Sequence, residues 1–422
     1  MPVSPLVYKE PVGVIGSGSF AITIAHLLSH NVNVLIYSRR QEIVDEINVK
    51  HRMFDHDLHP RISATNDISE IGLKCSIIFP IIPSEFFRSA IRQVAEFVSP
   101  KHIMIHGTKG FDIINQVNYE DATLSRKDIR TMSEVILEET SVLRIGALSG
   151  PNLYREILDG QPAATVVASK YDEVIKICQK ILDGPNFAVF GSRELLGAEL
   201  AGALKNIIAL CTGMLNGLGM GKNIEALLIT RGLRELIFIG KAMDVPTRAF
   251  LGTAGIGDLI ATATSSSSRN YTFGQRLARG ETKEDIAKSM SGLAEGVRVL
   301  KITNGLINHY KVNAPIITLL HKVVFEGYNL HTAIKFLMRY PYVQDVDFAN
   351  GFMHSNIFRP PYGRIKPSQF RILSKRYKII MWNVLSMDYS RRVSPRRVVN
   401  NVINHVQPGS IIVFHDSKKA ER

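Results

Sequence analysis

The chain has 422 residues, of which 45% are hydrophobic, and a formal net charge of +13 at pH 7. This length suits two or three domains, and the composition is that of an ordinary globular protein, which excludes a disordered or fibrous chain. We expect no transmembrane segment and no signal peptide, because no stretch reaches about 18 uncharged apolar residues and the first residues show no basic segment followed by an apolar one.

The positive charge is concentrated near the C-terminal end. Residues 351–422 carry 14 Lys and Arg against 3 Asp and Glu, whereas the first 350 residues carry 37 against 35. A strongly basic domain usually suggests nucleic-acid binding. Because the excess belongs to the tail, we do not expect nucleic acid as a partner of the main body.

The three cysteines, Cys75, Cys178 and Cys211, have neither disulfide nor metal-site spacing. They are typical of reduced core residues in a cytoplasmic protein. The residues of the predicted site contain no cluster of His, Cys and carboxylate side chains, so we expect no metal.

A dinucleotide-binding pattern opens the chain. Residues 12–15 read as a buried strand, the glycine turn Gly16-Ser17-Gly18 follows, residues 22–28 read as an apolar helix, and 34–37 as the next strand. Gly16 permits the tight turn, Gly18 lets the backbone approach a pyrophosphate, and Ala21 takes the third position, where alanine is tolerated. The helix start then offers free N–H groups to phosphate. A purely structural turn is the alternative.

The second strand ends in Tyr37-Ser38-Arg39-Arg40, without the acidic residue that binds the ribose hydroxyls of NAD. Two arginines can instead pair with a 2′-phosphate. We therefore expect NADP to be used at least as well as NAD, unless Arg39 and Arg40 belong to a solvated loop.

Further strands are predicted at 76–79 and 102–106, and the second runs into Thr108-Lys109-Gly110. Ligands in open α/β sheets bind at the carboxyl ends of the strands. Lys109 is thus placed to meet substrate or cofactor, and an exposed loop lysine is the alternative.

From about residue 192 the chain reads mostly helical, with glycine-rich connections at Gly213, Gly217, Gly219 and Gly221. Residues 265–270, with four serines, Arg269 and Asn270, open a helix over 271–278 and suit a phosphate group. A serine-rich linker with an ordinary N-cap is the alternative.

Lys205 lies in a run, 197–211, that reads as a buried helix. Lysine is rarely buried without a partner, so this amine either reaches water or faces a polar cavity. From this stretch alone, a lysine whose stem packs and whose head reaches water is favoured. Its neighbours at helical spacing are small or apolar and include no carboxylate: Ala201, Gly202, Ile208 and Ala209.

Together these segments resemble the bacterial type of NAD(P)-dependent glycerol-3-phosphate dehydrogenase over about residues 10–348. The matching segments are Gly16–Phe20, Thr108–Gly110, Ser149–Asn152, Gly202–Asn206, Ile229–Leu233, Gly255–Leu259, Ser268–Asn270 and Ala294–Gly296. The resemblance implies an enzyme that reversibly reduces dihydroxyacetone phosphate to sn-glycerol 3-phosphate with NADPH or NADH. It also implies a cytoplasmic homodimer that supplies glycerophospholipid synthesis.

The resemblance also implies roles for individual residues. Lys205 matches the proton acceptor in glycerol-3-phosphate oxidation, with Lys109 and Asp258 as the other catalytic residues. The implied substrate contacts are Lys109, Gly150, Asn152, Asn206, Asp258, Ser268, Arg269 and Asn270. The implied cofactor contacts are Gly16, Gly18, Ser19, Phe20, Arg39, Arg40, Lys109, Tyr154, Arg269, Leu293 and Glu295. Tyr154 stands where the family often has a small residue.

The C-terminal part resembles a different family. The segments Phe358–Gly363, Ile379–Trp382, Asp388–Tyr389 and Gly409–Asp416 are similar to the C-terminal part of a polysaccharide deacetylase domain. The earlier Asp-Asp and His-x-x-x-His elements of that family's metal site do not precede Arg359 here. We interpret the tail as a fusion remnant or mis-joined reading frame. A basic arm for nucleic acid or an anionic surface, and a residual deacetylase, are alternatives.

The expected fold is therefore a Rossmann-type α/β domain over 1–191, an all-α substrate domain over 192–348, and an α/β tail fragment of incomplete deacetylase type over 349–422.

Overall fold

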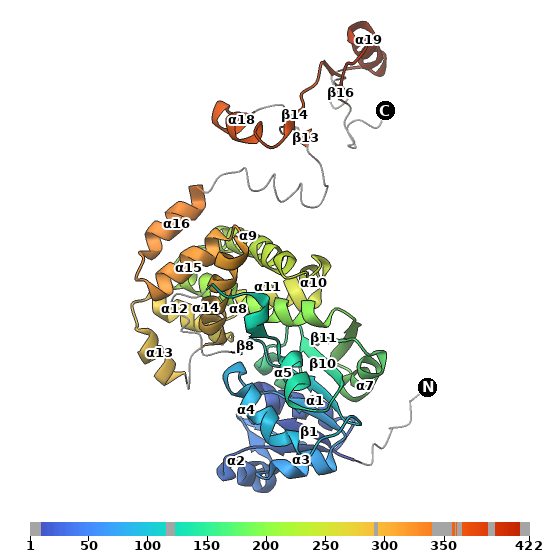
Figure 1. Cartoon of the computed structure of the whole chain (residues 1–422), viewed down its shortest axis with the longest axis vertical. Coiled ribbons are helices and arrows are strands. Elements are labelled where there is room, and N and C mark those ends of the chain that lie inside the picture. Colours follow the sequence, from blue (N-terminus) through green and yellow to red (C-terminus); the bar gives the residue numbers. More distant parts are fainter. Residues whose placement is uncertain are drawn as a thin grey trace. The chain divides into compact units, whose positions relative to one another are not determined.

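The computed structural model describes residues 10–114, 123–290, 294–339, 357–358, 360, 365–386 and 393–413. The chain forms two compact units, Met1–Leu337 and Met338–Arg422. The first unit combines an eight-stranded sheet, built from the N-terminal half of the chain, with a bundle of helices that follows it (Figure 1). The predicted pairing of a Rossmann-type domain with a helical domain is confirmed.

The sheet has the strand order β12-β11-β10-β7-β6-β1-β2-β5. Neighbouring strands are parallel, except that β11 runs antiparallel to β10. The order reverses at β1, whose two neighbours are β2 and β6, and ligands bind at such a switch point. The strands are β1 (Val12–Ile15), β2 (Val34–Tyr37), β5 (Ile62–Thr65), β6 (Ile77–Pro80), β7 (Ile103–His106), β10 (Arg144–Ser149), β11 (Ala163–Ser169) and β12 (Phe187–Ser192).

Helices cover both faces of the sheet because its strands are apolar on both sides. Val12 and Val14 pack with α1 and α7 on one face, while Ile15 packs with α3, α4 and α5 on the other. The helices of this part are α1 (Ser19–Ser29), α2 (Gln41–Asp45), α3 (Ile68–Lys74), α4 (Ser84–Ala95), α5 (Met132–Glu139), α6 (Tyr154–Leu158) and α7 (Asp172–Leu182). Two small hairpins complete it, β3 (Arg52–Met53) with β4 (His56–Asp57), and β8 (Asp112–Ile113) with β9 (Ile129–Arg130).

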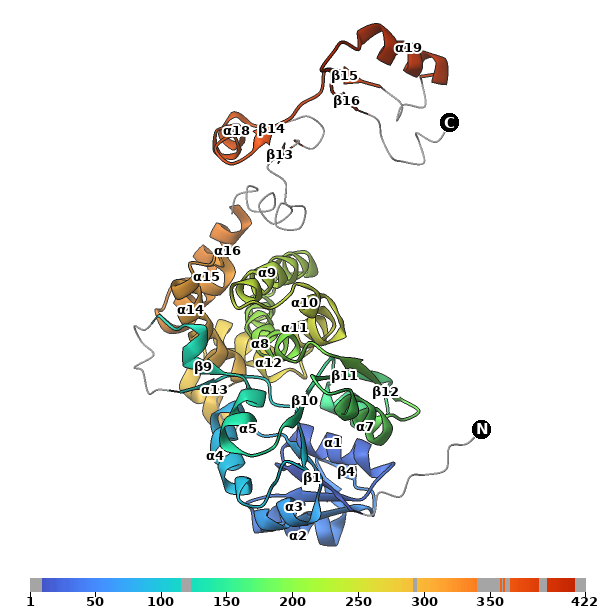
Figure 2. The same cartoon turned by 45° about the vertical axis from the view of Figure 1, so that its right-hand side comes forward.

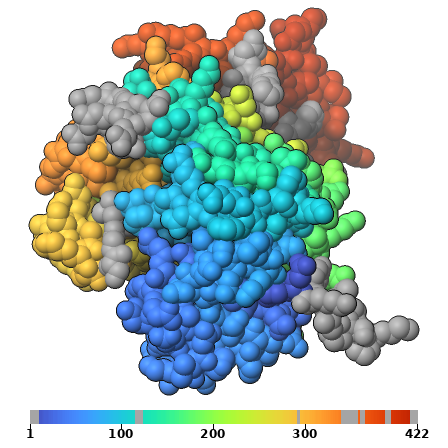
Figure 3. All heavy atoms as spheres, turned by 60° about the horizontal axis from the view of Figure 1, so that its bottom comes forward, coloured from blue at the N-terminus to red at the C-terminus, as the bar shows by residue number. Residues whose placement is uncertain are grey.

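The helical part is built around α8 (Leu195–Gly217), which is buried over nearly its whole length (Figure 2). Alone among the described helices, α8 is long and apolar enough to cross a membrane, but here it forms the core of a helical bundle. The helices around it are α9 (Lys222–Ala242), α10 (Arg248–Leu251), α11 (Asp258–Thr264), α12 (Arg269–Ala278), α13 (Lys283–Ser289), α14 (Glu295–Tyr310), α15 (Pro315–Phe325) and α16 (Leu330–Arg339). In Figure 3 the sheet domain forms one continuous surface from blue to cyan, with helical elements in yellow and orange beside it.

Helices α8 and α12 cross at very short range. A Cβ atom at Gly213 would overlap the carbonyl oxygen of Tyr271, and one at Gly274 would overlap that of Leu210. The interpretation of Gly213 and Gly217 as connections is therefore wrong, because both lie inside α8, where glycine permits the close crossing. Gly219 does lie in a turn, with a φ of +70°.

The second unit holds two short strand–helix–strand elements. In each, the two strands pair in parallel, β13 (Ile357–Phe358) with β14 (Lys378–Ile379) and β15 (Val384–Leu385) with β16 (Ile412–Val413). Helix α18 (Pro367–Leu373) connects the first pair and α19 (Pro395–His405) the second. Of the predicted deacetylase resemblance, the residues Arg359, Asp388, His415 and Asp416 lie outside the described residues.

Candidate active site

Lys205 is the centre of a buried polar cluster between α8 and α11. Its side chain is 5% exposed, and its Nζ donates to Oδ1 of Asp258 and, over 2.6 Å, to the hydroxyl of Thr262. The interpretation of Lys205 as a lysine that reaches water is therefore wrong. The carboxylate that the neighbours of Lys205 on α8 do not supply comes from α11, 53 residues further along the chain.

Lys109 completes the cluster from the sheet side. It follows β7, and its Nζ lies 2.7 Å from Oδ2 of Asp258 and 3.4 Å from the carbonyl oxygen of Gly150. Asp258 is 1% exposed, and each of its carboxylate oxygens accepts a hydrogen bond from one lysine amine. Two ammonium groups and one carboxylate leave a net positive charge, which suits an anionic substrate.

Burial lowers the pKa of Lys205 from 10.5 to about 7, because its charged form loses solvation. The carboxylate of Asp258 opposes this shift, and the nearby charge of Lys109 adds to it. An amine whose pKa lies near neutrality can both give up and take up a proton at physiological pH.

The absence of a side chain at Gly202 lets residues 107–111, called here the Lys109 segment, lie against α8. A Cβ atom there would lie 3.2 Å from Oγ of Ser149 and 3.5 Å from Cγ of Lys109. The stem of Lys109 therefore packs directly over this position of α8, one turn before Lys205.

Thr262 belongs to this cluster, although it was not among the predicted site residues. It lies one helical turn after Asp258, and residues four apart share a face of a helix. In the sequence, Thr262 was indicated by a hydroxyl side chain four residues after Asp258. The hydroxyl of Thr262 accepts from Lys205 and lies 3.4 Å from Oδ1 of Asp258.

A chain of amide contacts connects three helices at the predicted phosphate end. The Nδ2 of Asn270 donates to Oδ1 of Asn206 over 2.9 Å, and the backbone N–H of Gly296 donates to Oδ1 of Asn270 over 2.7 Å. Ser268 is the N-cap of α12 and accepts from the N–H of Tyr271. These contacts fix the start of α12, where backbone N–H groups favour an anion.

Arg269 is the first residue of α12 and is exposed. Its guanidinium donates to the carbonyl oxygen of Met290 over 3.2 Å. Residues 291–293, which follow Met290 and include the predicted cofactor contact Leu293, lie outside the described residues. Arg269 thus presents a cation next to the start of its own helix.

Gly150 and Asn152 lie on the sheet side, after β10. Gly150 has a φ of +155°, and its backbone packs closely against Thr165. Nδ2 of Asn152 donates to the Thr165 hydroxyl over 2.9 Å, while its Oδ1 is buried without a partner among the described residues. A buried acceptor without a donor is the kind of group that a bound hydroxyl satisfies.

The predicted dinucleotide turn has the required shape. Gly16 has a φ of +122°, and a Cβ atom there would overlap the carbonyl oxygen of Ile81, which follows β6. Gly18 is the N-cap of α1 and has open space around its Cβ direction, with no side-chain cap on the helix. The first N–H groups of α1, beginning at Ser19, are thus available to a pyrophosphate. Phe20 packs over Gly107 beside this turn.

The loop after β2 lies beside this turn, since Ser17 and Ser38 share a hydroxyl contact of 2.9 Å. Arg39 and Arg40 follow directly and are exposed. Tyr154 begins α6, and its hydroxyl accepts from Nε of Arg155 over 2.9 Å.

Glu295 joins the two halves of the first unit. Its carboxylate accepts from the backbone N–H of Ser84 over 2.8 Å and from the Ser84 hydroxyl over 2.9 Å. It therefore caps the start of α4 from the start of α14, and Arg298 also reaches Ser84.

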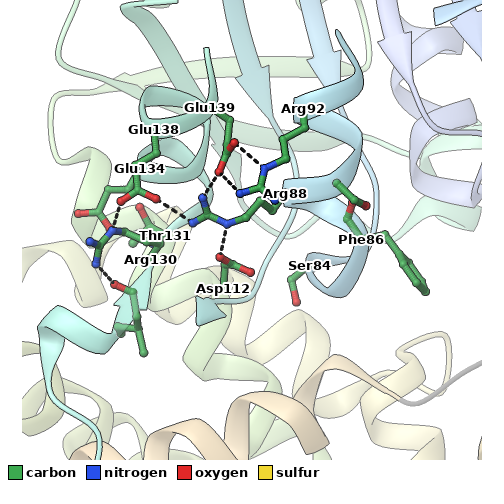
Figure 4. Close-up of polar contacts among 12 residues, drawn as sticks. Ser84, Phe86, Arg88, Arg92, Asp112, Arg130, Thr131, Glu134, Glu138 and Glu139 are labelled. Atoms are coloured by element: carbon green, nitrogen blue, oxygen red, sulfur yellow. Dashed lines mark hydrogen bonds and ion pairs between the residues drawn. The ribbon is translucent and has the colours of Figure 1, made fainter. Parts of the chain in front are cut away.

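A charged network supports the segment after Lys109 (Figure 4). Arg88 on α4 donates to Asp112 over 2.7 Å, to Glu138 over 2.8 Å and to Glu139. Arg92 binds Glu139 from the next turn of α4. These pairs connect α4, α5 and β8, and sequence spacing did not predict them because the partners lie 24 to 51 residues apart.

Among the described residues, no group of three or more His, Cys, Asp and Glu side chains is arranged to hold a metal ion.

Comparison with known proteins agrees with this arrangement. Residues 11–175 match the model of the NAD-dependent glycerol-3-phosphate dehydrogenase N-terminus, and 194–335 match that of the C-terminus. The chain is 36% identical over 346 residues to glycerol-3-phosphate dehydrogenase [NAD(P)+] of Pseudomonas fluorescens (strain SBW25), covering 81% of this chain and 97% of that protein. It is also 36% identical over 335 residues to the protein of the same name from Macrococcus caseolyticus (strain JCSC5402), covering 78% and 97%.

Among solved structures, glycerol-3-phosphate dehydrogenase from Coxiella burnetii superposes with a TM-score of 0.70 at 26% identity. The match covers 78% of this chain and 99% of that one. The similarity thus extends over both parts of the first unit.

Proposed function

The chain belongs to the NAD-dependent glycerol-3-phosphate dehydrogenase family and interconverts dihydroxyacetone phosphate and glycerol 3-phosphate with NAD or NADP, and we propose that Lys205, Lys109 and Asp258 perform its proton transfer. This activity supplies glycerophospholipid synthesis. The observation that carries the proposal is the buried carboxylate of Asp258 with one lysine amine on each oxygen.

The chemistry requires control of one proton. A bound nicotinamide cofactor would supply the hydride that reduces the carbonyl carbon of dihydroxyacetone phosphate, and negative charge would then develop on the carbonyl oxygen. The ammonium of Lys205 stabilises this oxygen and delivers the proton. In the reverse direction the neutral amine of Lys205 accepts the proton of the alcohol. Asp258 and Thr262 hold this amine in place in both directions.

Lys109 has a second role in the proposal. Its amine contacts Asp258 and lies near the carbonyl oxygen of Gly150, at the end of the sheet where the cofactor turn is located. It therefore reaches substrate and cofactor together. Its charge also favours the neutral form of Lys205.

The remaining substrate contacts hold the phosphate and the hydroxyl groups. Ser268, Arg269 and Asn270 form the start of α12, which together with the guanidinium favours a phosphate. Asn206 orients Asn270, and the unpartnered Oδ1 of Asn152 accepts from a substrate hydroxyl. Binding energy from the phosphate then positions the carbonyl for reaction.

Residues at the carboxyl end of β1 would hold the cofactor. Gly16, Gly18, Ser19 and Phe20 hold the pyrophosphate side, because Gly18 leaves space and α1 leaves its N–H groups free. Other cofactor contacts are assigned to Lys109, Tyr154, Arg269, Leu293 and Glu295. Arg39 and Arg40 pair with the 2′-phosphate, so NADP is used at least as well as NAD.

The proposed organisation keeps the boundaries 1–191, 192–348 and 349–422. The protein is a cytoplasmic homodimer, in keeping with the family resemblance. Its three cysteines are free and buried, which supports a reducing compartment. Light scattering of the purified chain tests the dimer.

The tail is a fragment of deacetylase-like sequence without hydrolytic activity. Its two parallel strand–helix–strand elements support that origin, since such elements are the repeating unit of α/β barrels. In the described part of the tail the strands are two residues long and form two separate two-stranded pairs, which argues against a working barrel. The tail contributes nothing to the dehydrogenase reaction.

The direct test is NADPH oxidation by the purified chain with dihydroxyacetone phosphate as substrate. Turnover that depends on this substrate, and its loss in Lys205→Ala, are expected. Turnover that survives in Lys205→Ala would refute the proposed site while leaving the family intact.

A further inference from the structure

His106 and Glu199 form a second buried pair that the proposed chemistry does not use. Nε2 of His106 lies 2.9 Å from Oε1 of Glu199, and their side chains are 2% and 5% exposed. The same carboxylate oxygen accepts from the backbone N–H of Ser133 over 2.8 Å, at the start of α5. A buried carboxylate is costly unless hydrogen bonds compensate for the lost water.

The contacts of the histidine all lie on one side of its ring. Nε2 of His106 faces Oε1 of Glu199 and lies 3.2 Å from the hydroxyl of Ser133. Nδ1 is buried and has no hydrogen-bond partner among the described residues. The ring of Phe87 lies edge-on at 6.0 Å and fixes the plane of the imidazole. His106 is thus held in one orientation, with Nε2 toward Glu199.

The pair bridges the same two elements as the reacting lysines. His106 ends β7, three residues before Lys109. Glu199, Gly202 and Lys205 follow one another at intervals of three residues along α8, which places them on one ridge of the helix. Between the two bridges, the stem of Lys109 packs on Gly202.

We propose that His106 and Glu199 are positioning residues that set the Lys109 segment against α8 and so fix the distance from Lys109 to Asp258 and Lys205. The segment is held at three points. His106 anchors its start, the hydroxyl of Thr108 donates to the carbonyl oxygen of Ile82 over 2.6 Å, and Arg88 anchors Asp112 beyond its end. Only the first anchor connects the segment to the helix that carries Lys205.

The inference rests on the proposed role of Lys109, and kinetics separate it from a simple contribution to stability. His106→Leu removes the donor, and a shift of Lys109 by a fraction of an ångström to about 1 Å is expected to lower kcat by about 10- to 100-fold. NADPH affinity is expected to fall much less than kcat, because Lys109 is one of several proposed cofactor contacts and the glycine turn is left unchanged. His106→Gln returns an amide donor near the position of Nε2 and is expected to restore most of the turnover.

Val174→Ala is the matched control. Val174 is fully buried on α7, on the opposite face of the sheet from α4 and α5, so its truncation destabilises the sheet domain without touching the Lys109 segment. It is expected to lower the melting temperature and leave kcat unchanged at 25 °C. Equal losses of kcat in both variants would show a general effect of destabilisation and overturn the inference.

The deciding experiment places His106→Leu in a Lys109→Ala background. If His106 acts through Lys109, the second substitution has no further effect on kcat. If the two residues have independent roles, the two fold-losses of kcat multiply. Multiplied losses overturn the inference and leave the proposed function standing. Wild-type turnover in Lys109→Ala alone would instead refute the proposed function. If His106→Leu does not fold, Glu199→Gln replaces it in the same test. Glu199→Gln keeps the side-chain volume and removes the charge, and it is expected to show the same pattern with a smaller loss of kcat.

Discussion

Lys109 and Asp258 meet across the two halves of the first unit, with Nζ 2.7 Å from Oδ2, although they lie 149 residues apart in the chain. The other oxygen of the same carboxylate binds Lys205. One aspartate thus fixes two amines relative to each other. The proposed proton-transfer site is therefore complete only when the sheet domain and the helical domain are packed together.

Replacement of Lys205 by alanine is expected to lower kcat for dihydroxyacetone phosphate reduction by about 10²- to 10⁴-fold, the usual contribution of a positioned general acid. The fold should survive, because Asp258 keeps its contact with Lys109. Steady-state kinetics with circular dichroism measure both effects. Lys74→Ala, at an exposed position on α3, is the control and should retain full activity. Near-normal turnover in Lys205→Ala contradicts the assignment.

The reaction should depend on pH in opposite senses in its two directions. In the proposed mechanism, reduction uses the ammonium of Lys205, so kcat/KM should fall as the pH rises through the pKa of about 7. Oxidation of glycerol 3-phosphate uses the neutral amine, so it rises over the same range. The residual activity of Lys205→Ala should lack this inflection. An inflection caused by titration of the substrate phosphate would persist in this variant, so the comparison separates the two causes.

Asp258→Asn should move that inflection to lower pH. The charge of Asp258 raises the pKa of Lys205, so its removal leaves burial and Lys109 to lower the pKa further. The pH profile of kcat for glycerol 3-phosphate oxidation measures the shift. An unchanged inflection would show that the titrating group is not Lys205.

Arg269→Ala should raise KM for dihydroxyacetone phosphate more than it lowers kcat. A hydrogen bond to a charged group contributes about 1.5–3 kcal/mol, which corresponds to roughly 10- to 150-fold in binding. Phosphate-free dihydroxyacetone serves as the comparison substrate, and the preference for the phosphorylated one should shrink. Arg279→Ala, at the opposite end of α12, is the matched control. If discrimination is unchanged, Arg269 is not the phosphate anchor.

The pair Arg39 and Arg40 should determine cofactor preference. Their joint replacement by alanine is expected to lower kcat/KM for NADPH by at least about 10-fold, because a charged hydrogen bond to the 2′-phosphate is lost. The value for NADH should change little. A large preference of the wild-type chain for NADH would contradict the prediction.

Truncation after residue 348 should leave dehydrogenase kinetics unchanged. The tail carries a net charge of +11, so salt-sensitive binding to DNA or anionic vesicles that disappears on truncation would favour a binding arm. Metal-dependent acetate release from an acetylated sugar would favour a deacetylase. Neither activity is expected.

The sequence by itself determined the dinucleotide domain and its position. The strands Val12–Ile15 and Val34–Tyr37 form as predicted, and the turn between β1 and α1 contains the positive φ at Gly16. These features are local, because a short apolar run and a glycine turn are each recognised from a few neighbouring positions. The helical character of the second domain followed from the same kind of local pattern.

The tertiary structure decided the environment of the reacting groups. Local spacing favoured a solvated head group for Lys205, yet Asp258 and Thr262 from another helix make its burial favourable. In the same way, Glu295 caps α4, and Glu199 binds His106, over separations that no local pattern records. The physical reason is that the energy of a buried charge depends on partners brought close by packing, whereas secondary structure depends mainly on adjacent residues.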